Sequence, residues 1–159
     1  MTSIRQYRSS DAERVAFIIR DTFSHFNKND GTKSAVAKYV GHYDTKKRGL
    51  DKITEEFSDI PIFYVAVEDG GVVGLVRGFE RRVINLFVLG KYHGKGIGKD
   101  LMERFESEAK RKGSKQINIR ASTYAVPFYE HLGYKKTTGI RTFRRIPGLR
   151  IQPMRKKLR

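Results

Sequence analysis

Three glycines at alternating positions make up the stretch of this chain best suited to bind a ligand through its backbone. Gly94, Gly96 and Gly98 follow an apolar run and open a helical pattern. Glycine tolerates positive φ and leaves the backbone N–H groups uncovered. A run of such groups at a helix N-terminus attracts an anion, helped by the helix dipole. The spacing therefore predicts a phosphate-binding loop, and a tight structural turn is the alternative.

The spacing also excludes two common phosphate loops. A nucleoside triphosphate loop needs Gly-Lys followed by Ser or Thr, whereas Gly98-Lys99 is followed by Asp100. A dinucleotide loop needs Gly-x-Gly-x-x-Gly, and here the third glycine comes one residue early. A different phosphate-bearing ligand is expected.

The elements on either side must hold this loop in position. Val83–Leu89 is β-branched and apolar apart from Asn85, as in a central strand covered on both faces. The following helix carries one apolar stripe and ends at Lys112-Gly113; the stripe consists of Ile97, Leu101, Phe105 and Ala109. The next strand, Lys115–Ala121, should lie parallel to the central strand because a helix separates the two.

The rest of the pattern predicts one domain over residues 1–159, with no linker. Strands are expected at Ser3–Arg8, Pro61–Glu68 and Val72–Arg77, the last broken at Gly78, and near Tyr134–Phe143 and Leu149–Leu158. Asp69-Gly70-Gly71 is typical of a hairpin turn. Helices are expected from Asp11 to Phe26, from Ser34 to Tyr43, from Leu50 to Phe57 and from Ala125 to His131.

Composition narrows the function. The 159 residues contain no cysteine, which excludes disulfides, thiolate metal sites and an acyl-cysteine intermediate. No apolar run approaches the roughly 20 residues of a membrane span and no signal peptide pattern is present, so a cytoplasmic protein without membrane contact is expected. The net charge of +16 would attract nucleic acid, acidic substrates or a phosphate-rich cofactor, or is simply that of a basic surface.

A second motif follows the predicted parallel strand. Residues 122–134 read Ser-Thr-Tyr-Ala-Val-Pro-Phe-Tyr-Glu-His-Leu-Gly-Tyr. This resembles the Asn-x-x-Ala-x-x-Phe-Tyr-x-x-x-Gly-Phe/Tyr motif of the GNAT superfamily of N-acetyltransferases. In that superfamily an Arg/Gln-x-x-Gly-x-Gly/Ala loop binds a pyrophosphate, and residues 93–98 resemble it. His93 and Ser122 depart from the usual Arg/Gln and Asn.

The resemblance spans essentially the whole chain and implies its fold and co-substrate. It implies an α/β (α+β) GNAT fold, with a mixed, mostly antiparallel sheet of six to seven strands flanked by helices. The central strand would end in a bulge and splay from its parallel neighbour to hold acetyl-CoA. The implied cofactor-binding residues are Leu86, Phe87, Val88, His93, Gly94, Lys95, Gly96, Ile97, Gly98, Lys99, Ser122 and Tyr129.

The resemblance also implies a mechanism, in which an amine attacks the thioester directly in a ternary complex. The backbone N–H of Val88 would stabilise the oxyanion, and Tyr129 would protonate the leaving thiolate. A buried packing role is the alternative for Tyr129. Glu80, His25 and His42 are candidates for the base, none supported by a motif. The four histidines lack metal-ligand spacing, so no metal is expected.

Two other functions stay open. One is a GNAT module that binds a CoA ester without turnover, against which the presence of Tyr129 and of the glycine loop argues. The other is a basic nucleic-acid-binding or ribosome-binding protein. It is not favoured because Tyr134–Arg145 gives only a hint of aromatic residues interleaved with basic ones, not a pattern. The amine acceptor is not identified by the sequence. A homodimer is compatible with the resemblance.

Overall fold

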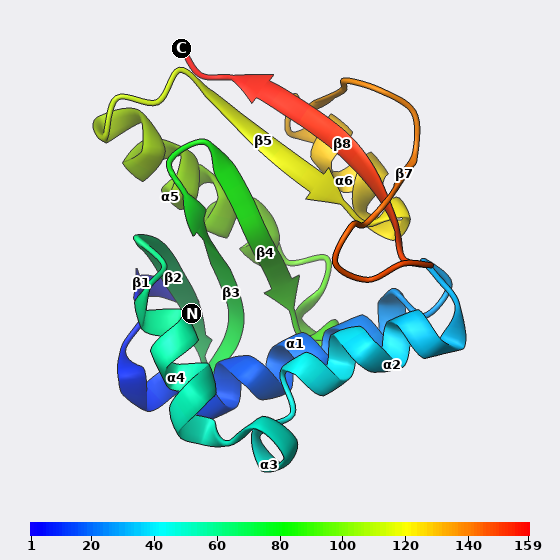
Figure 1. The fold of residues 1–159 in the computed structure, drawn as a ribbon. Coiled ribbons are helices and arrows are strands. Elements are labelled where there is room, and N and C mark those ends of the chain that lie inside the picture. The colour runs from blue at the N-terminus through cyan, green and yellow to red at the C-terminus, as the bar shows by residue number, and fades with distance from the viewer.

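The computed structural model describes residues 1–159 and contains one mixed eight-stranded sheet with helices on both faces (Figure 1). The strand order is β1-β2-β3-β4-β5-β8-β6, and β7 pairs with the free end of β8. The strands are β1 (Ser3–Gln6), β2 (Ile62–Glu68), β3 (Gly71–Phe79), β4 (Arg82–Val88), β5 (Gln116–Ala121), β6 (Lys135–Lys136), β7 (Arg141–Thr142) and β8 (Arg150–Lys157). The helices are α1 (Ala12–Phe26), α2 (Lys33–His42), α3 (Thr45–Arg48), α4 (Leu50–Ser58), α5 (Ile97–Arg111) and α6 (Val126–His131).

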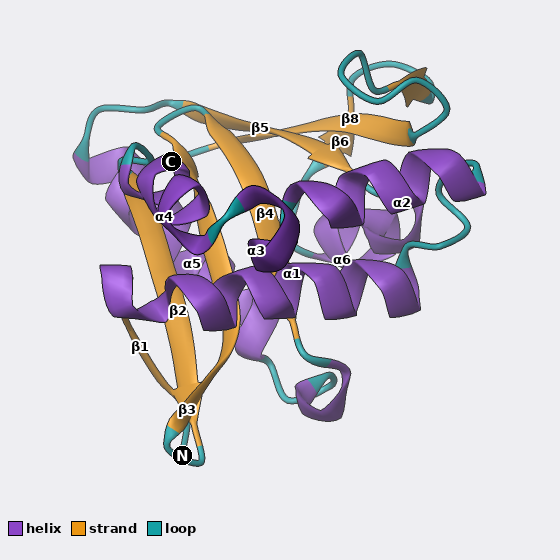
Figure 2. Cartoon of the chain, turned by 60° about the horizontal axis from the view of Figure 1, so that its bottom comes forward, coloured by secondary structure: helices purple, strands orange, loops and turns teal.

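Strands β1 to β4 are antiparallel neighbours in the sheet, and they separate two apolar clusters. Helices α1 and α4 pack on one face, and α5 packs on the other (Figure 2). The predicted stripe of α5 is buried, and Phe105 has no exposed surface. Burial of one such side chain contributes about 1.5–3 kcal/mol. This packing fixes α5, and therefore its N-terminus, against the middle of the sheet.

The β2–β3 connection is the predicted hairpin. Glu68 pairs with Gly71, so Asp69 and Gly70 form a two-residue loop, and both have positive φ. That conformation matches the right-handed twist of the paired strands. The predicted break at Gly78 is wrong, because β3 continues to Phe79 across a register shift.

The central strands β4 and β5 are parallel but pair only at their beginnings. Arg82 lies opposite Asn118, and Val83 opposite Ile119; no pairing follows. The β3–β4 register leaves Ile84 without a partner, and such an extra residue bends a strand and increases its twist. The family resemblance implied a bulge at the end of the central strand. The structure instead has the bulge directly after the last β4–β5 pair. Beyond it the two strands diverge (Figure 1).

The C-terminal part differs most from the sequence prediction. The expected strand near Tyr134–Phe143 is two short strands, β6 and β7, which both pair with β8. Residues 137–140, between β6 and β7, lie opposite only two residues of β8, Gln152 and Pro153. Proline cannot donate a hydrogen bond to a neighbouring strand, so the pairing is interrupted there. The split raises the strand count to eight.

Most other predicted elements are confirmed to within two residues at each end, while the short helix α3 was not predicted. None of the helices is both long and apolar enough to cross a lipid bilayer.

Candidate functional site

The glycine loop leads directly into the N-terminus of α5. Gly94 and Gly96 have φ of 76° and 81°, and Gly96 is the residue that precedes the first turn of the helix. The backbone N–H groups from Gly94 to Lys99 donate no hydrogen bond to the protein. These groups lie at the positive end of the α5 dipole, and four of the six residues are exposed. The loop therefore presents a set of unpaired donors to an anion, as the sequence predicts.

The side chains around the loop have separate contacts. The Nε2 atom of His93 lies 2.5 Å from the carbonyl oxygen of Val88, and its ring packs on Phe26 at 4.7 Å. Lys95 extends over the ring of Tyr92, and Lys99 lies 4.0 Å from Glu103. The predicted role of His93, Lys95 and Lys99 in phosphate binding would therefore be carried by their exposed backbone. The ammonium groups of Lys95 and Lys99 lie nearby.

Strand β4 presents an open edge on the side from which β5 diverges. Leu89 donates its N–H to the carbonyl of Val73, so the pair Val88–Gly74 is of the non-hydrogen-bonded type. The backbone groups of Val88 therefore point away from β3, and by alternation so do those of Leu86. The backbone groups of Phe87 pair with β3 instead. Of the three predicted edge residues, Leu86 and Val88 offer free N–H groups.

Tyr129 lies on α6, the helix that follows β5. Its side chain is buried in the cluster that contains Val88, and its ring meets the rings of Phe128 and Tyr134 edge to face. Its hydroxyl has no hydrogen-bond partner in the protein. The side-chain oxygens that are both fully buried and without a partner are those of Tyr7 and Thr22, so the Tyr129 hydroxyl is not completely enclosed. Burial raises the pKa of Tyr129, so the phenol is protonated at neutral pH.

The segment before α6 is fixed by contacts that the sequence motif does not reveal. Ser122 accepts a hydrogen bond from the N–H of Ala125 at 3.3 Å and caps the turn between β5 and α6. Buried Asp30 accepts hydrogen bonds from the backbone and the hydroxyl of Thr123. Asp30 thereby ties the loop after α1 to the segment that carries Tyr129.

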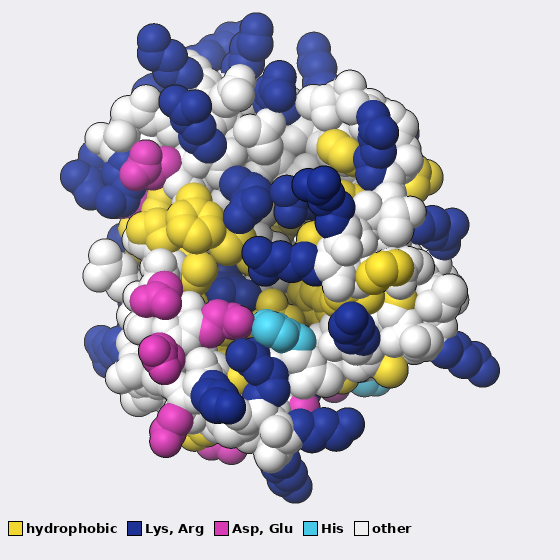
Figure 3. Space-filling view, in the orientation of Figure 1, with side chains coloured by type: hydrophobic (Ala, Val, Ile, Leu, Met, Phe, Trp, Pro, Cys, Tyr) yellow, Lys and Arg dark blue, Asp and Glu magenta, His cyan; other side chains and the backbone are white.

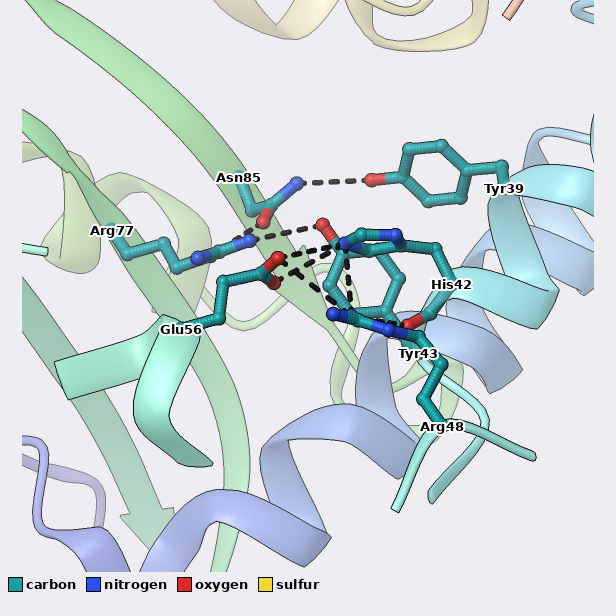
Figure 4. Close-up of polar contacts among 7 residues, drawn as sticks. All are labelled: Tyr39, His42, Tyr43, Arg48, Glu56, Arg77 and Asn85. Carbon is teal, nitrogen blue, oxygen red and sulfur yellow. Dashed lines mark hydrogen bonds and ion pairs between the residues drawn. The ribbon is translucent and has the colours of Figure 1, made fainter. Parts of the chain in front are cut away.

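A buried polar network lies on the opposite face of β3 and β4, beneath α2 (Figure 4). Arg77 donates to Asn85 Oδ1 at 2.7 Å and to the hydroxyl of Tyr43 at 2.9 Å, and Asn85 donates to the hydroxyl of Tyr39 at 3.0 Å. Burial raises the pKa of both tyrosines, so they stay neutral. Asn85 was the one polar residue in an apolar strand pattern. That exception could have indicated a partner on the neighbouring strand.

The three candidate bases differ in their surroundings. Glu80 is exposed in the β3–β4 turn, and His25 is exposed and contacts the carbonyl of Asp21. His42 Nε2 lies 2.9 Å from Glu56 and 3.2 Å from Arg48, at the edge of the polar network (Figure 4). None of the three contacts Val88 or Tyr129. No three His, Asp or Glu side chains gather in metal-binding geometry.

Solved structures of the same fold are numerous. A GCN5-related N-acetyltransferase from Rhodopseudomonas palustris aligns with a TM-score of 0.85 and 20% identity, over 99% of this chain and 96% of the other. PaiA N-acetyltransferase from Thermoplasma acidophilum, solved with coenzyme A, aligns with a TM-score of 0.76 and 20% identity over 99% of both chains. YncA from Salmonella typhimurium, solved with acetyl-CoA, aligns with a TM-score of 0.64 and 19% identity, over 100% and 95%.

At these identities the alignments establish the fold. The family is established by the sequence itself: the model of the acetyltransferase (GNAT) domain matches residues 28–158. That range includes the glycine loop, the open strand edge and Tyr129. The chain therefore belongs to the GNAT acetyltransferase family, which confirms the resemblance found in its two motifs.

Proposed function

We propose that this protein transfers an acetyl group from acetyl-CoA directly to an amine in a ternary complex. One observation carries the proposal: six consecutive unpaired N–H groups lie at the start of α5, next to an open strand edge. The N–H groups can bind the diphosphate of coenzyme A, and the open strand edge can pair with its extended, amide-bearing arm. The coenzyme A and acetyl-CoA complexes of structurally similar proteins support this reading.

In this proposal the backbone from Gly94 to Lys99 binds the diphosphate, and the edge at Leu86 and Val88 pairs with the pantetheine arm. The positive end of α5 and the chain's net charge of +16 favour the anionic co-substrate. Ser122 has a structural role as a cap, and any contact with the co-substrate comes in addition. No residue is required to hold a metal.

The chemistry follows from the two groups at the thioester. The amine nitrogen attacks the carbonyl carbon, and the free N–H of Val88 donates to the developing oxyanion. Loss of such a donor typically costs about 2.7–4 kcal/mol of transition-state stabilisation. The C–S bond then breaks, and Tyr129 gives its proton to the sulfur. The attacking nitrogen loses its extra proton to solvent, and solvent returns a proton to the Tyr129 phenolate. An acyl-cysteine intermediate is excluded because the chain has no cysteine.

The amine must lose a proton before it attacks, because an alkylamine is mostly protonated at neutral pH. His42, which is paired with Glu56, is the base candidate with a carboxylate partner. A water chain to bulk solvent is the other route. We also propose that residues 1–159 form a single acetyltransferase domain and that the protein is cytoplasmic.

The test is acetyl transfer to a panel of amines. Wild-type protein with acetyl-CoA should release CoA in proportion to amine consumed, and mass spectrometry should detect the N-acetylated product. Binding of acetyl-CoA without transfer to any amine would favour the non-catalytic module. Failure to bind acetyl-CoA would refute the proposal.

A further inference from the structure

Three arginines surround a pocket on the face of the sheet opposite α5. The pocket has a volume of about 510 Å³ and lies between the β3–β4 hairpin and strands β5 and β8. Arg81 lies in the β3–β4 turn, Arg82 at the start of β4 and Arg120 on β5, and all three line the pocket. We call Arg81, Arg82 and Arg120 the arginine cluster. None of them takes part in the seven ion pairs of the protein.

The cluster is held in place although its members repel one another. The Arg82 guanidinium lies 5.6 Å from the ring centre of Phe79, and that of Arg120 lies 6.0 Å from the ring centre of Phe143. The pKa of Arg82 is lowered, first by burial and then by the charges of Arg120 and Arg145. Such an arrangement costs free energy in the absence of an anion.

No acidic side chain compensates these charges. The pocket is lined by neutral and basic residues only. Figure 3 shows the same face: Lys and Arg side chains crowd the upper rim of its central hollow, whereas most of the Asp and Glu side chains lie over α4 and reach the lower rim beside a His side chain. An oxyanion is the ligand that a set of planar, unpaired guanidinium groups fits best.

The position of the cluster relates it to the acceptor amine. Arg82 precedes the last β4–β5 pair and Arg120 follows it, at the point where the two strands separate. Val88 lies four residues beyond Ile84, the residue level with Arg120, or about 13 Å along the strand. A molecule lying along the diverging strands could therefore place an amine at Val88 and an anion at the cluster.

We infer that the acceptor of this acetyltransferase carries a carboxylate or phosphate several bonds from its amine, which the arginine cluster binds. This inference rests on the proposed function. A compact pocket suits a small anion or the acidic end of a short peptide better than the continuous backbone of a polynucleotide.

Matched acceptors test the inference. The pair 6-aminohexanoate and 6-aminohexanamide differs only in charge, and 5-aminopentylphosphonate supplies the phosphate-type anion. At 0.15 M salt the two anions should be acetylated with kcat/KM at least about 10-fold higher than the amide. Whichever of the carboxylate and the phosphonate has the higher kcat/KM identifies the preferred anion.

Two variants locate the effect. Arg120→Gln should remove the preference by raising the KM of the anionic acceptors, with unchanged affinity for acetyl-CoA. Arg111→Gln is the matched control: Arg111 is exposed on α5 and pairs with Glu108, so the preference should persist. Loss of acetyl-CoA affinity in Arg120→Gln, with the preference retained, would assign the cluster to the co-substrate and overturn the inference.

Product binding separates this inference from the proposed function. Calorimetry with N-acetyl-6-aminohexanoate and its amide, in the presence of CoA, needs no turnover. The carboxylate should bind at least about 10-fold more tightly, and Arg120→Gln should abolish the difference. Equal binding of the two by wild-type protein overturns the inference even if acetyl transfer is observed. Absence of transfer to every amine refutes the proposed function, while the binding difference still decides the anion preference.

Discussion

Replacement of Tyr129 by phenylalanine removes one oxygen from the site and little else. Its hydroxyl has no protein partner, so the substitution leaves no donor or acceptor unpaired. The free energy of unfolding should change by less than the roughly 1 kcal/mol of a typical hydrogen bond. If the phenol protonates the thiolate, kcat should fall about 10²- to 10⁴-fold, with the affinity for acetyl-CoA unchanged.

The pH dependence gives a second readout. Because burial raises the pKa of Tyr129 above its ordinary value of 10, the phenol remains a proton donor throughout the neutral range. Wild-type kcat should therefore not decline through ionisation of this residue between about pH 7 and pH 10. Released CoA can be followed with a thiol reagent, and the protein adds no background because it contains no cysteine.

Tyr134→Phe is the matched control. Tyr134 is as deeply buried in the same cluster, but its hydroxyl donates to Glu106 at 2.8 Å. Loss of a hydrogen bond to a charged group should cost about 1.5–3 kcal/mol of stability while kcat is preserved. Equal losses of kcat in the two variants, or a fall in acetyl-CoA affinity that matches the loss of kcat in Tyr129→Phe, would refute the assignment of Tyr129 as the acid.

Three further predictions concern the loop, the last strand and an ion pair. Gly96→Val should abolish acetyl-CoA binding measured by calorimetry, whereas Gly113→Val, equally strained at the other end of α5, should lower only the melting temperature. Deletion of residues 155–159 removes three of the six β5–β8 pairs and should lower the melting temperature; no change would make the tail dispensable. Burial raises the pKa of Asp11, but hydrogen bonds from Arg5 and Arg8 outweigh it and leave the pKa below 3.8. Stability from this pair is complete above that value and is lost as the pH falls through the lowered pKa, so acid unfolding of Asp11→Asn should lack this component.

The sequence predicts best what depends on local pattern. The stripe of α5 and the Asp69-Gly70 hairpin each follow from the needs of a few neighbouring residues, and both are confirmed. The glycine loop lies at the N-terminus of α5 as expected, and its binding of phosphate stays a prediction. The chemical roles of Tyr129 and Val88 came from the family motif and remain proposals.

The features that escaped prediction depend on contacts between distant segments. The arginine cluster combines residues from the β3–β4 turn, β4 and β5, and each of them alone looks like an ordinary surface charge. The bond from Arg77 to Asn85 depends on the β3–β4 register, which a bulge at Ile84 shifts. The split into β6 and β7 depends on which residues face Pro153.

The most direct test is a titration of isotope-labelled protein with acetyl-CoA, followed through the backbone amide resonances. The account predicts that the largest shift changes fall on the amides from Gly94 to Lys99 and on those of Leu86 and Val88, while the amide of Phe87, paired with β3, changes less. Saturable binding that leaves the loop amides unmoved and shifts another surface would contradict it.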